Sequence, residues 1–184
     1  MSESTSNEEL LEVFEEFSRL GNLRYGGLPY QHKVELATAM GRLNKQLRSR
    51  NLFQECLQVD IENVELHRSL VEDEHETYTP GLATALYRLG KSWRRLEEYQ
   101  KATVVGEEAV QLRRQLANTD PKRYNEDLAA AVRNLGFYWF QLADFGKARA
   151  QYEDFIQLLR RLENKNLGQY EADLAQGTFQ HFFE

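Results

Sequence analysis

The chain repeats itself with a period of 46 residues, and this period constrains its fold more than any other feature. The apolar and small residues of positions 36–44 recur in the same order at 82–90 and at 128–136, and a fourth copy begins at Leu174-Ala175. Periods of about 20–50 residues are typical of stacked supersecondary units, each of which completes its core only against its neighbours. The period therefore predicts an array of small units, and such arrays usually work as binding surfaces.

Each repeat has the pattern of two amphipathic helices. In the second copy one face of the first helix would carry the apolar residues Leu82, Leu86, Leu89, Trp93 and Leu96. Thr79-Pro80 combines an N-cap residue with a proline suited to a first turn, so we expect this helix to start there. A second helix is expected from near Glu97 to near Ala117.

Composition agrees with helices that have solvated outer faces. Of the 184 residues, 28 % are charged and only three are proline. The sequence shows no long apolar run and no secretion signal, and its one cysteine, Cys56, excludes an internal disulfide framework. We therefore expect a cytoplasmic protein without a membrane span.

The period also predicts the domain organisation. Residues 1–7 are expected to be disordered, and residues 8–184 to form a single array. The array would consist of a half repeat, three full repeats and a second half repeat at 8–30, 31–76, 77–122, 123–168 and 169–184. The last apolar residues of this array, Phe179, Phe182 and Phe183, have no following helix to cover them. We therefore expect either self-association through these residues or a larger parent chain.

The first repeat departs from the other two at three positions. Arg50, Asp60 and Asn63 replace residues that are apolar or glycine in the later copies. Polar side chains at inward positions weaken a hydrophobic core, so we expect looser packing in this repeat.

Several of these residues match a known motif. The segments Leu89-Gly90-x-x-Trp93 and Leu135-Gly136-x-x-Trp139, with the aromatic and alanine residues that follow each, resemble the tetratricopeptide repeat signature. The period is longer than the usual one of about 34 residues, and is similar to that of the kinesin-light-chain-like variant and of arrays in STAND-type signalling proteins. The resemblance implies an all-α fold, a right-handed α-solenoid of antiparallel helical hairpins, whose first helices line a concave groove.

Charge is sorted along the chain. Residues 82–95 carry four basic residues and no acidic one, whereas residues 55–76 carry eight acidic residues against Arg68. The whole chain has a formal net charge of −6. The basic residues are thus concentrated in the predicted first helices, which favours an acidic partner there.

Residues one period apart would form rows along the groove that change from basic to aromatic. We therefore expect a non-catalytic module that binds a protein or peptide with acidic residues and an apolar anchor. The candidate groove residues are Arg42, Lys45, Arg48, Thr84, Tyr87, Arg88, Lys91, Arg94, Arg133, Asn134, Phe137 and Phe140. Two alternatives remain: the basic residues form only a solvated face, or the chain is a sensor or assembly segment of a larger STAND-type protein or a self-associating scaffold.

Signals of catalysis and of cofactor binding are weak. Gly90-Lys91-Ser92 resembles the end of a phosphate-binding loop, but Ala85 stands where that motif needs its first glycine. Cys56 takes the small-residue position of Ala102 and Ala148, which favours a buried structural thiol over a nucleophile. We expect neither an enzyme nor a bound cofactor.

Metal and nucleic-acid binding are not favoured either. The four histidines show no zinc-ligand spacing. The net negative charge opposes generic phosphate binding, and no nucleic-acid-binding module is recognisable.

Overall fold

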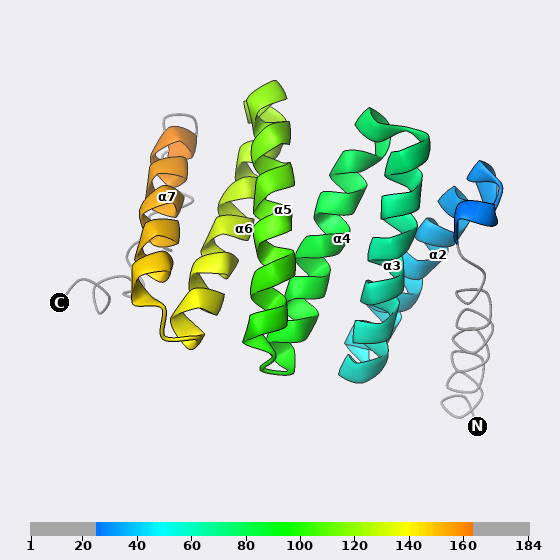
Figure 1. Cartoon of the computed structure of the whole chain (residues 1–184), viewed down its shortest axis with the longest axis horizontal. Helices are drawn as coiled ribbons and strands as arrows, with labels where there is room; N and C mark the ends of the chain where they lie inside the picture. The colour runs from blue at the N-terminus through cyan, green and yellow to red at the C-terminus, as the bar shows by residue number, and fades with distance from the viewer. Residues whose placement is uncertain (1–24, 164–184) are drawn as a thin grey trace. The chain divides into compact units, whose positions relative to one another are not determined.

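The structure, a computed structural model, describes residues 25–163 (Figure 1). These residues contain no strand, so the prediction of an all-α fold of repeated helical hairpins is confirmed. The predicted segments 1–7 and 169–184 and most of the half repeat 8–30 lie outside the described residues. The described elements are a short 3-10 helix, η1 (Tyr25–Gly27), and the helices α2 (Tyr30–Ser49), α3 (Phe53–Asp73), α4 (His75–Arg95), α5 (Tyr99–Thr119), α6 (Pro121–Gln141) and α7 (Phe145–Glu163).

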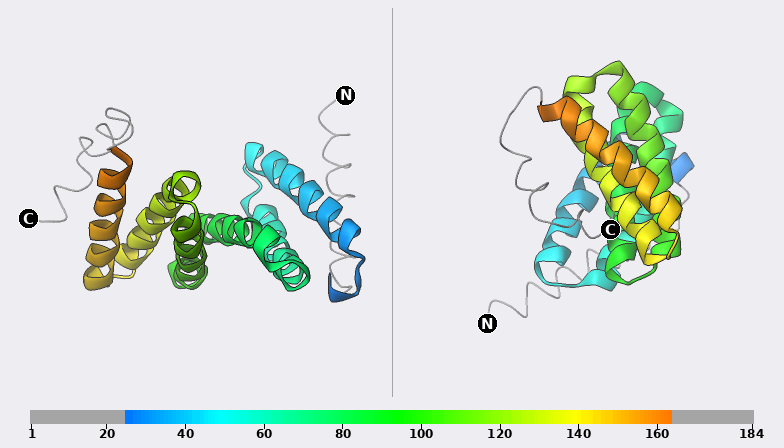
Figure 2. Two further views of the ribbon diagram at one scale, coloured as in Figure 1. Left: turned by 90° about the horizontal axis from the view of Figure 1, so that it is seen from above. Right: turned by 90° about the vertical axis from the view of Figure 1, so that its left-hand side faces the viewer.

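The chain divides into two compact units at residues 92 and 93. In the first unit α2 packs against α3, and η1 also contacts α3. In the second unit α6 packs between α5 and α7, as Figure 1 and the left view of Figure 2 show. Helix α4 belongs to the first unit up to Ser92, and its last three residues belong to the second.

The turn inside each hairpin has the same backbone in all three described repeats. Asn51, Glu97 and Ala143, spaced by one period, have φ of 60°, 60° and 57°. In the first turn the Leu52 amide donates to the Leu47 carbonyl over 3.1 Å and the Asn51 amide to the Arg48 carbonyl over 3.2 Å, and the same two bonds recur at the later turns. This pair of bonds is a Schellman motif, which ends a helix with one left-handed residue.

The predicted apolar stripe is confirmed for its first three residues in α4 and α6, whereas Trp93 is half-buried and Leu96 lies beyond the end of α4. Leu82, Leu86 and Leu89 on α4 are buried, as are Leu128, Val132 and Leu135 on α6. Small residues of the second helices are buried as well, among them Ala102 and Ala148. Cys56 lies buried at the equivalent position on α3 and forms no disulfide, as expected for a structural thiol.

The predicted start of α4 is wrong. The helix begins at His75, so Thr79 lies inside it, buried, with its hydroxyl donating to the His75 carbonyl over 2.6 Å. Pro80 therefore falls within the helix and not in its first turn. Helix α6 follows the expected rule instead: it begins at Pro121, and the Asp120 carboxylate caps it.

Glycine and tyrosine complement each other between the helices of the second unit. A Cβ atom on Gly106 would lie 3.3 Å from the ring of Tyr138, and one on Gly136 would lie 3.1 Å from the ring of Tyr152. Both rings are buried. The absent side chains let each aromatic ring lie directly on the backbone of the neighbouring helix.

Candidate functional site

The first unit holds a polar network at the position where the second unit holds aromatic rings. The Asp60 side chain on α3 is fully buried and accepts three hydrogen bonds. Asn44 Nδ2 donates to Oδ1 over 2.5 Å, while Arg48 and the Ser92 hydroxyl donate to Oδ2 over 3.0 and 2.5 Å. The network thus joins α2, α3 and α4.

Two of the three residues that led us to expect looser packing in the first repeat are buried in the structure. Asp60 is 0 % exposed and Asn63 only 5 %, while Arg50 is exposed. Asp60 is tolerated in the interior because donors on three sides satisfy its carboxylate.

The electrostatics of Asp60 are a balance of burial and pairing. Burial raises the pKa of its carboxyl above the ordinary value, while the hydrogen bond from Ser92 and the charge and hydrogen bond of Arg48 lower that pKa. Arg48 forms the ion pair with a side chain that is 27 % exposed, so its guanidinium is held at the edge of the interior.

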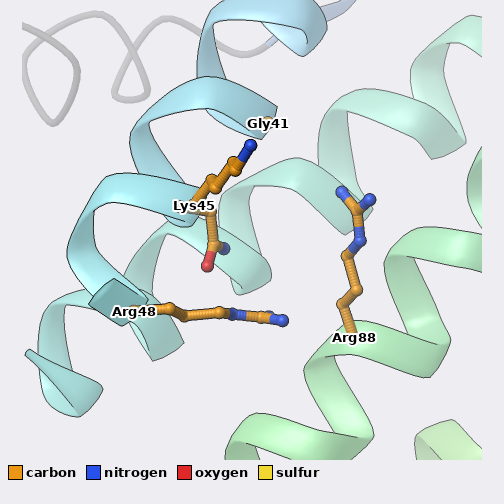
Figure 3. Close-up of a pocket in the computed structure, with 5 residues that line it drawn as sticks. Gly41, Lys45, Arg48 and Arg88 are labelled. Carbon is orange, nitrogen blue, oxygen red and sulfur yellow. The ribbon is translucent and has the colours of Figure 1, made fainter. Parts of the chain in front are cut away.

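A pocket of about 260 Å³ opens beside this network. It is lined by Gly41, Asn44, Lys45, Arg48 and Arg88, and we call it the basic pocket. Figure 3 shows Lys45 and Arg48 extending from α2, and Arg88 extending from α4 on the opposite side of the opening. The sequence placed these three cations in one groove, and the structure brings them together.

The basic pocket has more positive charge than its surroundings neutralise. Within residues 25–163, no carboxylate lies within ion-pair distance of Lys45 or Arg88. Arg48 alone is paired, with Asp60. Two polar atoms of the lining, Asn44 Oδ1 and Arg48 Nε, are buried without a hydrogen-bond partner in the described part of the chain. The positive charges of Lys45 and Arg88 at this opening favour an anionic ligand.

The other predicted residues of the first unit lie outside this pocket. Arg42 is exposed on α2. Thr84 donates its hydroxyl to the Pro80 carbonyl over 2.9 Å, which occupies it within α4. Lys91 Nζ lies 5.5 Å from the centre of the Tyr87 ring, a cation–π contact on the same helix.

In the second unit, two predicted residues meet and others do not. The Arg94 guanidinium lies 5.4 Å from the centre of the Phe137 ring, and Phe140 packs edge-on against Phe145 at 5.6 Å. Asn134 is only 7 % exposed, so it offers a partner almost no surface. The prediction of Asn134 as a contact residue is not supported, because its position on α6 turns it toward the core.

Arg133 lines a different cavity, of about 160 Å³, between α6 and α7. Its guanidinium lies 5.9 Å from the centre of the Phe155 ring, among the apolar residues Leu159 and Leu162. The predicted self-association residues Phe179, Phe182 and Phe183 lie outside the described residues.

Features of the other functional classes are accounted for by packing. Gly90-Lys91-Ser92 lies inside α4, and the Ser92 hydroxyl is used by Asp60. Residues 25–163 contain no group of three potential metal-ligating side chains. In the same stretch no helix combines the length and the apolar character that crossing a bilayer requires.

Sequence reasoning missed three residues of the site: Asn44 in the lining, and Asp60 and Ser92 beneath it. The signal was present, since Asn44 and Asp60 stand where the second repeat has Gly90 and Gly106. Two polar residues at positions that hold glycine in the next repeat indicate a buried hydrogen-bonded network, provided that the two positions are known to face each other.

Comparison with known proteins supports the family resemblance. A family model described as tetratricopeptide repeat matches residues 82–121, which cover most of α4, all of α5 and the start of α6. A comparison with curated proteins gives no match. The match supports a tetratricopeptide repeat in the middle of the chain, and such repeats generally mediate protein–protein interactions.

Proposed function

We propose that this chain is a non-catalytic protein-interaction module whose basic pocket binds an acidic segment of a partner protein. The observation that carries the proposal is the convergence of Lys45, Arg48 and Arg88 on one opening, where Asp60 is the one carboxylate paired with them among residues 25–163. Three cations on two helices repel one another, and an anionic ligand relieves that repulsion.

The pocket has the chemistry of a carboxylate or phosphate receptor. Guanidinium groups donate two parallel hydrogen bonds to such anions, and two of the three cations are arginines. Because Asp60 holds Arg48 in place, binding there loses less side-chain entropy than binding to a free arginine.

The aromatic residues of the second unit supply the second part of the proposal. Phe137 and Phe140 on α6 are half-buried, and Arg94 lies over the Phe137 ring. Partly exposed aromatic rings beside an arginine are typical of interface hot spots. We propose that they bind an apolar residue of the same partner or of another one.

A second candidate function keeps its sequence-based support. The 46-residue spacing is similar to that of STAND-type arrays, and three phenylalanines lie within residues 179–183. On this account the chain would assemble through those residues, in the cytoplasm. Replacing Phe179, Phe182 and Phe183 by serine would then lower the mass measured by light scattering, whereas the pocket proposal predicts no change.

The test of the pocket is an affinity capture with three forms of the full chain. One form carries Lys45→Glu and Arg88→Glu, which have no ion pair to lose among the described residues. A matched control carries Lys122→Glu and Arg161→Glu, two exposed residues of the second unit, and so has the same net charge. Circular dichroism establishes that all three remain helical.

The proposal predicts that the native chain and the control capture the same partner, whereas the pocket variant does not. A short polyglutamate peptide added to the native chain should compete with this partner and reduce its capture. Equal capture by all three forms would show that the basic pocket is not the binding surface.

A further inference from the structure

The charge of the basic pocket exceeds what one carboxylate ligand supplies. Lys45, Arg48 and Arg88 contribute three positive charges, and the Asp60 carboxylate offsets one of them. Two positive charges remain. An aspartate or glutamate side chain brings one negative charge, whereas a phosphorylated serine or threonine brings about −1.5 to −2 near neutral pH.

The arrangement of the donors also favours a phosphate group over a carboxylate. The cations approach from two helices on opposite sides of the opening, as Figure 3 shows for Arg48 and Arg88. A carboxylate has two oxygens in one plane, while a phosphate monoester has three terminal oxygens pointing in three directions. Three cationic side chains around one opening match the second geometry better than the first.

Asp60 does not compete with such a ligand for these donors. Its Oδ1 accepts from Asn44, and its Oδ2 accepts from both Arg48 and Ser92. The carboxylate is fully buried beneath the lining, so it offsets one positive charge by pairing with Arg48 and does not itself line the opening. The Arg48 side chain is 27 % exposed, so it can still present part of its guanidinium to a ligand.

The volume of the pocket also fits. At about 260 Å³ it exceeds the size of a bare anion and leaves room for the side chain that bears it. We infer that the ligand of the basic pocket is a phosphorylated serine or threonine of the partner segment, held by Lys45, Arg48 and Arg88. The inference rests on the proposed function, since it names the group by which the partner is recognised.

The test measures binding of the full chain to labelled peptide pools by fluorescence polarisation at physiological salt and pH 7.5. The pools are dodecapeptides with degenerate flanks and one fixed central residue, which is phosphoserine, glutamate or serine. A single-stranded oligonucleotide of equal length is a fourth probe, because nucleic acid offers the same phosphate chemistry.

The phosphoserine pool is expected to bind at least about tenfold more tightly than the glutamate pool, and the serine pool more weakly than both. Arg88→Gln should weaken binding of the phosphoserine pool by about tenfold or more. Arg42→Gln, which removes the same charge from an exposed site on α2 outside the pocket, should change it by less than about twofold.

Each other result overturns a defined part of the account. Equal affinity for the phosphoserine and glutamate pools, both lost with Arg88→Gln, would overturn the phosphate inference and leave the acidic-segment proposal standing. Tightest binding of the oligonucleotide would overturn the peptide ligand. Phosphoserine binding that is insensitive to Arg88→Gln, or no binding of any pool, would overturn the pocket itself. Arg88→Lys, which keeps the charge, shows an intermediate affinity if the native arginine binds as a fork.

Discussion

The two units fill the same position between helices in opposite ways. In the first unit Asp60 on α3 accepts a hydrogen bond from Ser92 on α4. One period later the corresponding pair in the second unit is Gly106 and Tyr138, where the ring lies against the glycine. Both arrangements are buried.

This difference between the units indicates where a functional requirement has changed residues that otherwise follow the packing pattern of the repeat. In the second unit the Tyr138 ring packs against Gly106. The polar network of the first unit also fixes Arg48 at the mouth of the basic pocket. A polar core usually costs stability relative to an apolar one, so its presence in one unit indicates a role beyond packing.

Among the substitutions that test this comparison, Asp60→Ala is expected to change the free energy of unfolding most. The change leaves the Asn44 amide and the Ser92 hydroxyl without an acceptor and opens a cavity at a site that is 0 % exposed. We expect a loss of about 2–4 kcal/mol in the free energy of unfolding, measured by urea denaturation. A loss below about 1 kcal/mol would show that the network contributes little beyond shape.

The second unit is tested by Gly136→Ala. The added Cβ would lie 3.1 Å from the Tyr152 ring and 3.2 Å from Gln151 Cβ, so the buried ring must shift. The expected loss is about 1–3 kcal/mol by the same method.

Gly41→Ala is the matched control in the first unit, since nothing lies within 4 Å of its added Cβ. That change should stabilise α2 by up to about 1 kcal/mol. A Gly136→Ala protein as stable as the control would disprove the close fit of ring and glycine.

The two units are also expected to differ in how their stability depends on pH. Burial lowers the pKa of His67 on α3, and the charge of Arg88 lowers it further, against the hydrogen bond to the Asn63 carbonyl. Because this pKa lies below the ordinary 6.5 in the folded state, the unfolded chain binds the proton more readily. The first unit should therefore lose stability as the pH falls below about 6.5.

Urea denaturation at pH 7.5, 6.5 and 5.5, compared with His67→Gln, measures this contribution. The native chain should lose more stability than the variant across that range. Parallel losses in both would assign the pH dependence to other groups. Residues 93–163 contain no histidine, so the described part of the second unit has no equivalent response.

The smallest expected effect concerns the hairpin turns, where the units differ in residue but not in backbone. Ala143 in the second unit has φ of 57°, and Asn51 in the first has φ of 60°. Alanine disfavours this region, whereas asparagine tolerates it and glycine is unstrained. Ala143→Gly should raise the free energy of unfolding by about 0.5–1 kcal/mol, and Asn51→Gly should raise it less. The opposite order, measured by thermal unfolding, would contradict the role given to the turn.

The helices were predictable because their signal is periodic. The buried stripe of Leu82, Leu86 and Leu89 follows directly from spacing. The start of α4 was not predictable in the same way, because Thr79-Pro80 resembles a helix start although the helix continues through it.

The pocket was predictable only in part. Lys45, Arg48 and Arg88 stand out by charge and by helix position. The role of Asp60 depends on which side chains of α2 and α4 reach it across the helix pair, and that depends on packing, which no single helix pattern contains.

The most direct test of the basic pocket as an anion site is nuclear magnetic resonance of the arginine Nε–H groups during titration with N-acetyl-phosphoserine amide. The account predicts saturable shifts at Arg48 and Arg88, which line the pocket, and none at Arg42 or Arg149. Uniform shifts at all four arginines, or no shift at Arg48 and Arg88, would contradict it.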